Sequence, residues 1–172
     1  ITQRVKNTGT SAVTLFSYGR ISRDDPPETD VRVGMYVHEG PIAVRNGELV
    51  EAEYEDLRED GATKVESESG GWVGVKDLYW VVALIPDQNA PLTMGFRHDE
   101  RYTDGQRYWI HYLDESGHEI APGGTVEVVS HMYAGPKQRR VLVDIMEDLG
   151  VERFDMAIDY TRIWFLTIPL HV

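Results

Sequence analysis

The sequence contains no cysteine, and this absence excludes disulfide scaffolds, thiol nucleophiles and thiolate metal sites. Cations are also scarce, since 17 lysine and arginine residues face 29 aspartate and glutamate residues and the formal net charge is −12. Nucleic-acid binding needs cations that displace counterions from phosphates, so the charge balance argues against a nucleic-acid partner. An anionic lipid surface would likewise repel most of this protein.

Long hydrophobic runs are missing too. The longest one, residues 78–85, has the length of a strand and stops at Pro86, whereas a membrane-spanning helix needs about 20 apolar residues. The chain starts at Ile1 and shows no signal-peptide pattern, so we interpret it as part of a longer protein. With 172 residues, 41% of them hydrophobic and 10% aromatic, it is long and apolar enough for one domain with a buried core.

The negative charge is concentrated in one stretch. Residues 23–68 hold 14 acidic and 5 basic side chains, a net charge of −9, which leaves −3 for the rest of the chain. Such a block is usually a solvated face that keeps a protein soluble. We therefore assign it no binding role on charge alone.

Alternating apolar residues and β-branched side chains, separated by turn signals, predict a mainly β protein. The first two predicted strands, 1–7 and 12–18, flank a turn signal at 7–10, so we expect them to pair as a hairpin. Asn46–Gly47 predicts a tight turn between strands at 42–45 and 48–51. Residues 51–58 fit either a short helix or an acidic strand. The other predicted strands cover residues 31–37, 70–75, 78–85, 92–96, 108–113 and 125–133.

The central part carries the strongest pattern. Residues 78–85 are apolar at consecutive positions, as expected of a central strand that is covered on both faces. Gly71 before Trp72 predicts a tight turn that presents a core aromatic. Pro136, Gly150 and apolar residues at four-residue spacing predict a helix near 137–149, and 154–160 alternates as one more strand. Many strands with little helix favour a β-sandwich.

Motifs that would indicate catalysis are missing. None of the six histidines has the spacing that places two imidazoles on one helical face. His111 and His131 lie in different predicted strands and have no pattern beyond that. No Gly-x-Ser-x-Gly elbow or phosphate-binding loop is present. We therefore expect a protein that is not an enzyme and that needs no metal or cofactor.

The C-terminal end is the most hydrophobic part of the chain. As a helix it would present apolar side chains nearly all round, so it must be buried or lie against lipid. Trp164 beside Tyr160 and Arg162 has the composition of an anchor at the level of lipid headgroups. The residues alone leave two alternatives equally open, a core helix that packs across the sandwich and a membrane-interface segment.

Five segments occur in an order that is similar to one known family. They are Gln3–Thr8, Gly70–Gly74, Trp80–Pro86, Tyr133–Lys137 and Asp159–Phe165. As an ordered set they resemble the large periplasmic domain of the bacterial YidC membrane protein insertases, of the Oxa1 family. The resemblance covers the whole chain, is weakest in the acidic residues 23–68 and is strongest in the closing segment.

This resemblance implies a β-supersandwich, akin in shape to sugar mutarotases and carbohydrate-binding modules, with short C-terminal helices. Residues 1–158 would be the C-terminal portion of that domain, and 159–172 would begin the interfacial amphipathic helix that leads to the transmembrane core. The site residues that the resemblance implies at the membrane interface are Tyr160, Arg162, Ile163, Trp164, Phe165 and Leu166.

The activity implied for the parent protein is the insertion, folding and assembly of inner-membrane proteins, alone or with the Sec translocon. The implied partners are nascent inner-membrane proteins, the Sec translocon with its accessory complex (SecYEG and SecDF), and the periplasmic leaflet of a Gram-negative inner membrane. The domain itself would be a non-catalytic scaffold, with Sec contacts in the acidic block and the Gly-Gly-Trp strand. Two alternatives stay open, a sugar- or peptide-binding module and a purely structural spacer.

Overall fold

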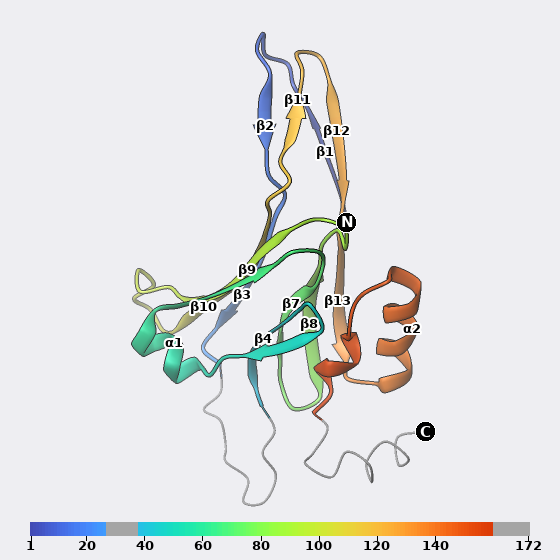
Figure 1. Ribbon diagram of the computed structural model, residues 1–172. Helices are drawn as coiled ribbons and strands as arrows, with labels where there is room; N and C mark the ends of the chain where they lie inside the picture. Colours follow the sequence, from blue (N-terminus) through green and yellow to red (C-terminus); the bar gives the residue numbers. More distant parts are fainter. Residues whose placement is uncertain (27–37, 160–172) are drawn as a thin grey trace, which may run out of the picture.

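The computed structural model describes residues 1–26 and 38–159, which form a mainly β protein (Figure 1). The predicted strand at 31–37 and the C-terminal residues 160–172 lie outside the described residues. The first seven strands are β1 (Thr2–Lys6), β2 (Val13–Leu15), β3 (Tyr18–Asp24), β4 (Gly40–Arg45), β5 (Glu48–Glu51), β6 (Ala62–Ser67) and β7 (Trp72–Lys76). The next six are β8 (Trp80–Ile85), β9 (Leu92–His98), β10 (Arg107–Asp114), β11 (His118–Ile120), β12 (Thr125–Val129) and β13 (His131–Pro136). The helices are α1 (Tyr54–Asp60), α2 (Arg139–Leu149) and the short 3-10 helix η1 (Phe154–Ala157).

Two antiparallel sheets face each other and confirm the predicted β-sandwich. One has the strand order β3-β10-β9-β6 and the other β13-β8-β7-β4-β5. The core between them is built from residues that alternate along the strands, such as Phe96 and Met94 in β9 and Tyr108 and Ile110 in β10. Helix α1 contributes Leu57 to the same core, so the segment that fitted a helix or a strand is a helix.

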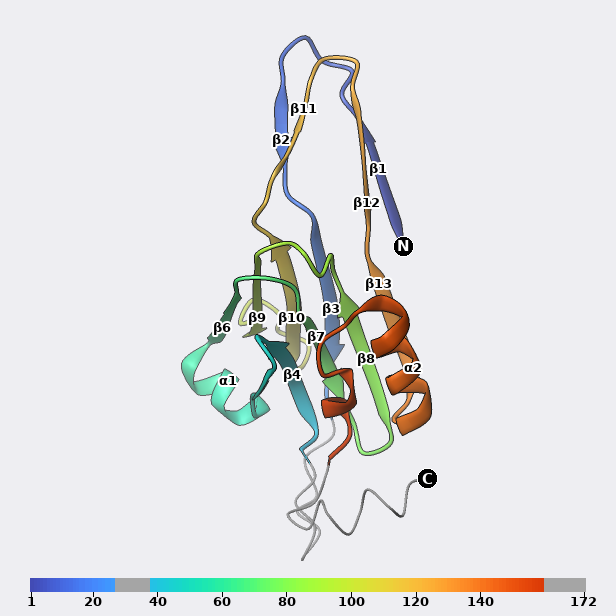
Figure 2. The same ribbon diagram turned by 45° about the vertical axis from the view of Figure 1, so that its right-hand side comes forward.

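A second core lies on the other face of the five-stranded sheet, where α2 and η1 pack (Figure 2). Trp72, Val81 and Ala83 point into it from β7 and β8, and Leu142 and Phe154 meet them from the helices. Strand β8 is therefore internal to its sheet and covered on both faces, as its continuous apolar run predicts.

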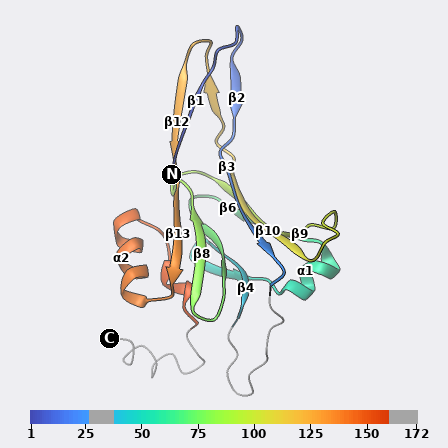
Figure 3. The same ribbon diagram turned by 180° about the vertical axis from the view of Figure 1, so that it is seen from behind.

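Two further strand pairs stand above the sandwich and form what we call the arm, namely β1 with β12 and β2 with β11 (Figures 1 and 3). The pair β2–β11 continues the path of β3 and β10, while β12 runs on into β13. The predicted hairpin of residues 1–7 and 12–18 is therefore wrong, because strands β1 and β2 each pair with residues more than 100 positions away. Turn signals report local geometry and carry no information on such distant pairing.

Two other expectations need correction. The predicted single strand at 125–133 is divided at Ser130 into β12 and β13, which belong to different sheets. In place of the predicted strand at 154–160, residues Phe154–Ala157 form the helix η1, because Phe154 and Ala157, three positions apart, both point into the second core. The Asn46–Gly47 turn is confirmed with positive φ at both residues, and α2 ends at Gly150 in the left-handed conformation.

Candidate functional site

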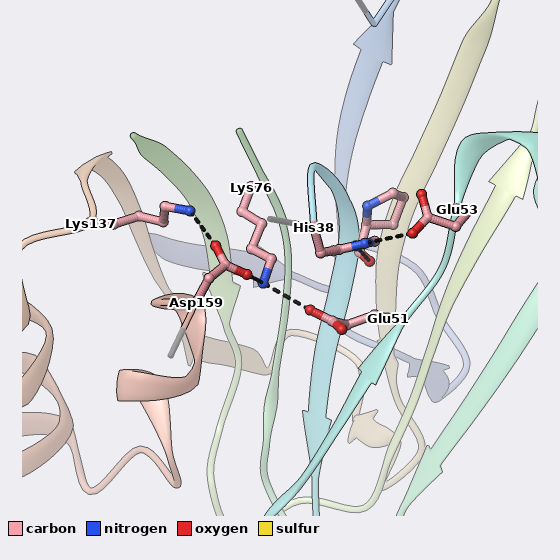
Figure 4. A network of polar contacts seen from close by, with 7 residues as sticks. His38, Glu51, Glu53, Lys76, Lys137 and Asp159 are labelled. Carbon is pink, nitrogen blue, oxygen red and sulfur yellow. Dashed lines mark hydrogen bonds and ion pairs between the residues drawn. The ribbon is translucent and has the colours of Figure 1, made fainter. Parts of the chain in front are cut away.

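Four charged side chains meet at the end of the five-stranded sheet that lies away from the arm (Figure 4). We call this cluster the exit junction, because its member Asp159 is the last described residue before the C-terminal segment. Lys76 comes from the end of β7 and Glu51 from the end of β5. Lys137 follows β13 directly, and Asp159 follows η1. The junction thus joins the sheet, its edge strand and the chain that covers it.

The geometry of the exit junction is that of a continuous ion-pair network. Lys76 Nζ donates to Glu51 Oε1 at 2.8 Å and to Asp159 Oδ1 at 2.6 Å. Lys137 Nζ donates to the second carboxylate oxygen of Asp159 at 2.8 Å. The Lys76 side chain is only 1% exposed and that of Asp159 17% exposed. Both oxygens of Asp159 are thereby held in fixed directions by two ammonium groups.

Charge balance explains why this cluster tolerates burial. Two ammonium groups face two carboxylates, so the junction carries no net charge, as buried ions require. Burial would raise the pKa of Asp159, but the charge of Lys76 and the hydrogen bonds from both lysines outweigh burial and hold that pKa below its ordinary value. Asp159 is therefore ionised at neutral pH and remains tied to the sheet.

The strand pattern places Lys76 in this position. Trp72, Gly74 and Lys76 share one face of β7, and that face is covered by the second core. A lysine at an inward position at the end of a strand is a signal that the sequence analysis missed. Next to the junction, His38 donates from Nε2 to the Pro41 carbonyl at 3.2 Å, and its Nδ1 lies 3.1 Å from Glu53 Oε1 (Figure 4).

None of the candidate site residues predicted from the sequence belongs to the exit junction. The six interface residues from Tyr160 to Leu166 lie outside the described part of the chain. His111 packs against Tyr18 in the four-stranded sheet, while His131 starts β13 in the other sheet. Burial and the charges of Arg97 and Arg20 lower the pKa of His111. Within residues 1–26 and 38–159, no three His, Asp or Glu side chains are grouped as metal ligands.

A shallow cavity of about 360 Å³ lies where the arm meets the sandwich. His118, His131 and Glu127 are among the residues that line it. Glu127 already pairs with Arg4 at 2.6 Å, and His118 lies 3.4 Å from Asp114. The cavity thus combines imidazole and carboxylate groups that are partly engaged with neighbouring side chains.

No helix among the described residues has the length and apolar character needed to cross a bilayer. The ion pairs of the exit junction have the chemistry of an anchor. It fastens the end of the described chain to the sheet through buried charges.

Comparison with known proteins identifies the family of this chain. The family model of the YidC periplasmic domain matches residues 1–172. Proteins named membrane protein insertase YidC are similar over 98–99% of the chain, with 36% identity in Maricaulis maris, 34% in Sinorhizobium fredii and 37% in Beijerinckia indica. The chain spans 28% of the length of each of these relatives. A match over the full chain, with relatives above 30% identity and the β-sandwich that the resemblance implied, shows that this chain belongs to the YidC periplasmic domain family.

Proposed function

We propose that this chain is the non-catalytic periplasmic scaffold of a membrane protein insertase, and that it holds residues 159–172 at the periplasmic leaflet of the inner membrane. The observation that carries this proposal is the exit junction. Asp159 is bound by two buried lysines and directly precedes Tyr160, the first of the predicted interface residues. A rigid attachment at this point fixes where the amphipathic segment leaves the domain.

The activity of the parent protein follows from its relatives. Proteins that are 34–37% identical carry the name membrane protein insertase. We therefore infer that the parent inserts, folds and assembles inner-membrane proteins, alone or with the Sec translocon. In this proposal the domain supplies position and contacts, and the membrane-embedded part of the parent supplies the insertion path.

The direct test places the full-length insertase that contains this chain in cells depleted of their own insertase. A variant with Trp164→Ser and Phe165→Ser removes the apolar anchor, and we expect client insertion, measured by protease accessibility, to fall strongly. Phe16→Ser, an exposed aromatic on the arm, is the matched control and should leave insertion intact. Undiminished insertion by the double variant would contradict the proposal.

Contacts with the Sec accessory complex form the second part of the proposal. The expectation from the sequence is that they lie in the acidic block and the Gly-Gly-Trp strand. Trp72 is fully buried beneath α2 and η1, so it cannot be such a contact itself. Helix α1 offers the exposed acidic side chains Glu55, Asp56 and Glu59 instead, and we assign the contact to this helix.

A photo-crosslinking residue at Asp56 in the full-length protein tests that assignment. We expect crosslinks to the Sec accessory complex at Asp56, and none when the same residue replaces Arg140 on the exposed side of α2. A purely structural spacer makes the opposite prediction, because its surface would give no specific crosslink at either position. Deletion of residues 1–150 with full client insertion and unchanged Sec association would favour the spacer.

A sugar-binding role is the second candidate, and the cavity at the base of the arm is the observation that favours it. His118, His131 and Glu127 supply the imidazole and carboxylate groups that such a site uses. Titration calorimetry with monosaccharides at millimolar concentration tests this role. Heat that disappears in a His131→Ala variant would support it, and the absence of heat would remove it.

A further inference from the structure

Exposed large apolar side chains gather at two ends of the molecule. Most belong to the arm and to the strand ends that adjoin it, and they are Ile1, Val5, Val13, Leu15, Phe16, Tyr18, Val129 and Met132. The other two, Tyr79 and Trp80, stand at the turn between β7 and β8 and are 68% and 57% exposed. Tyr79 is the most exposed large apolar residue among those described.

Turn geometry does not demand large apolar residues here. The Asp77 amide donates to the Trp80 carbonyl at 2.8 Å, so Leu78 and Tyr79 form a two-residue turn. Such turns favour small residues that tolerate positive φ, as at Asn46–Gly47. Neither Leu78 nor Tyr79 has a positive φ. The backbone of this turn therefore does not require aromatic residues, and the fold does not bury the side chains of Tyr79 and Trp80. We call Leu78–Tyr79–Trp80 the tip.

The tip is fixed beside the exit junction. The Lys137 amide donates to the Tyr79 carbonyl at 2.8 Å, while the Lys137 ammonium group binds Asp159. Lys76, three residues before Tyr79, binds Asp159 as well. The turn between β7 and β8 and the end of the described chain accordingly lie at the same end of the molecule (Figures 1 and 3).

The charges next to the turn between β7 and β8 indicate what kind of surface it could contact. The charged side chains beside it are paired, since Asp77 meets Arg23 at 3.1 Å and both Lys76 and Lys137 meet Asp159. The tip thus offers aromatic surface without unpaired charge from these neighbours. Tyrosine and tryptophan favour the headgroup layer of a bilayer, where the ring is half in apolar surroundings and its polar atom is hydrated.

We propose that the tip Leu78–Tyr79–Trp80 is a second membrane contact of this domain, and that it enters the headgroup layer of a zwitterionic bilayer next to the C-terminal segment. This inference rests on the proposed function, because that function brings residues 159–172 to the membrane. Two attachment points, the tip and the C-terminal segment, would set the tilt of the domain as well as its location.

The absence of cysteine makes the test direct, because one introduced cysteine can carry an environment-sensitive fluorophore. The probe is placed at Tyr79→Cys, at Phe16→Cys on the arm as the matched control, and at Trp164→Cys in the C-terminal segment. Phosphatidylcholine vesicles with brominated acyl chains are then added. We expect the labels at 79 and 164 to shift to the blue and to be quenched, and the label at 16 to remain in water.

The outcomes separate the two proposals. A label at 79 that stays in water while the label at 164 is quenched overturns the tip contact and leaves the proposed function standing. Labels at 79 and 164 that both stay in water overturn both. A label at 79 that is already shielded before vesicles are added means that the chain itself covers the tip, which also overturns the inference.

A binding measurement gives the magnitude. Tyr79→Ser with Trp80→Ser should weaken vesicle binding about tenfold or more, because the partial burial of even one aromatic ring contributes about a factor of ten to binding. Phe16→Ser should leave binding unchanged. Both side chains are exposed, so thermal unfolding of the variants should match that of the parent chain. Vesicle binding of the double variant equal to that of the parent chain would overturn the proposal.

Discussion

The arm and the exit junction lie at opposite ends of the protein and are stabilised in opposite ways. The arm consists of two-stranded pairs whose side chains are largely exposed, and its ion pair between Arg4 and Glu127 faces solvent. The exit junction buries Lys76 and links the ends of β5, β7, β13 and η1. Paired strands without a covering layer are marginal in water, whereas a buried network ties local geometry to global stability. A change at the exit junction should therefore affect the whole domain, and a change in the arm only the arm.

The largest effect is expected from Lys76→Ala. This change leaves the carboxylates of Glu51 and Asp159 without their buried partner, and we expect the free energy of unfolding to fall by about 3–5 kcal/mol. Urea unfolding followed by circular dichroism measures it. Lys64→Ala, which removes a solvent-exposed pair with Glu66, is the matched control and should leave the free energy of unfolding nearly unchanged. Equal costs for the two lysines would refute a special role for burial.

Apolar burial should show the same contrast. Leu142→Ala removes a fully buried side chain between α2 and the five-stranded sheet, and we expect a loss of roughly 2–5 kcal/mol. Leu15→Ala makes the same chemical change on the arm, where the side chain is 40% exposed, and should cost at most about 1 kcal/mol. Thermal unfolding compares the two, and a larger loss for Leu15 would reverse the proposed difference between the ends.

The side chain of Asn7 holds separate segments of the arm together through hydrogen bonds. Its Nδ2 donates to the carbonyl oxygens of Ser11 and Ile120, and it is buried. Asn7→Ala removes the hydrogen bonds that the buried Nδ2 group donates to the Ser11 and Ile120 carbonyls, so we expect a local loss of about 1–3 kcal/mol. Hydrogen exchange read by mass spectrometry should quicken in β1, β2, β11 and β12 while β7 and β8 stay protected. Faster exchange throughout the sandwich would mean that the arm and the sandwich unfold together.

The smallest expected effect is on how the free energy of unfolding depends on pH. The pKa of Asp159 is below its ordinary value of 3.8 in the folded protein, so the unfolded chain takes up the proton first as pH falls. The contribution of Asp159 to stability is thus complete above the ordinary pKa and is lost as pH drops through the lowered one. Asp159→Asn should show a smaller loss of stability between about pH 7 and about pH 3 than the parent chain.

Asp24→Asn is the control for the pH experiment. The hydrogen bond from Arg107 holds the pKa of Asp24 below its ordinary value as well, but this pair is exposed to solvent. Screening by water reduces what such a pair contributes, so its removal should change the pH profile less than the removal of Asp159. A profile for Asp159→Asn that coincides with that of the parent chain would show that the junction does not stabilise through this carboxylate.

Local signals in the sequence were sufficient for several elements. Asn46–Gly47 predicts the turn between β4 and β5, because few residue pairs accept positive φ at both positions. Gly150 predicts the end of α2 for a similar reason. The continuous apolar run of β8 predicts a strand that is covered twice, and both covering layers are present. Each of these predictions rests on a pattern within a short stretch of the sequence.

Features that depend on residues far apart in the chain could not be predicted from local patterns in the sequence. The pairing of β1 with β12 and of β2 with β11 joins residues that no turn signal connects. Phe154 and Met156 alternate as in a strand, yet packing against Trp72 favours a helical turn there. The role of Lys76 was missed as well, because the partners that make a buried lysine tolerable, Glu51 and Asp159, lie 25 and 83 residues away.

The sequence by itself determined the β-rich class, the family and the positions of glycine-marked turns such as Asn46–Gly47, because composition, alternation and glycine placement act over short stretches of chain. Only the tertiary structure decided which strands became neighbours and which charges were buried together. Those outcomes follow from the packing of two cores around one sheet, in which residues far apart in sequence compete for the same space. The exit junction at Asp159 is a product of that packing.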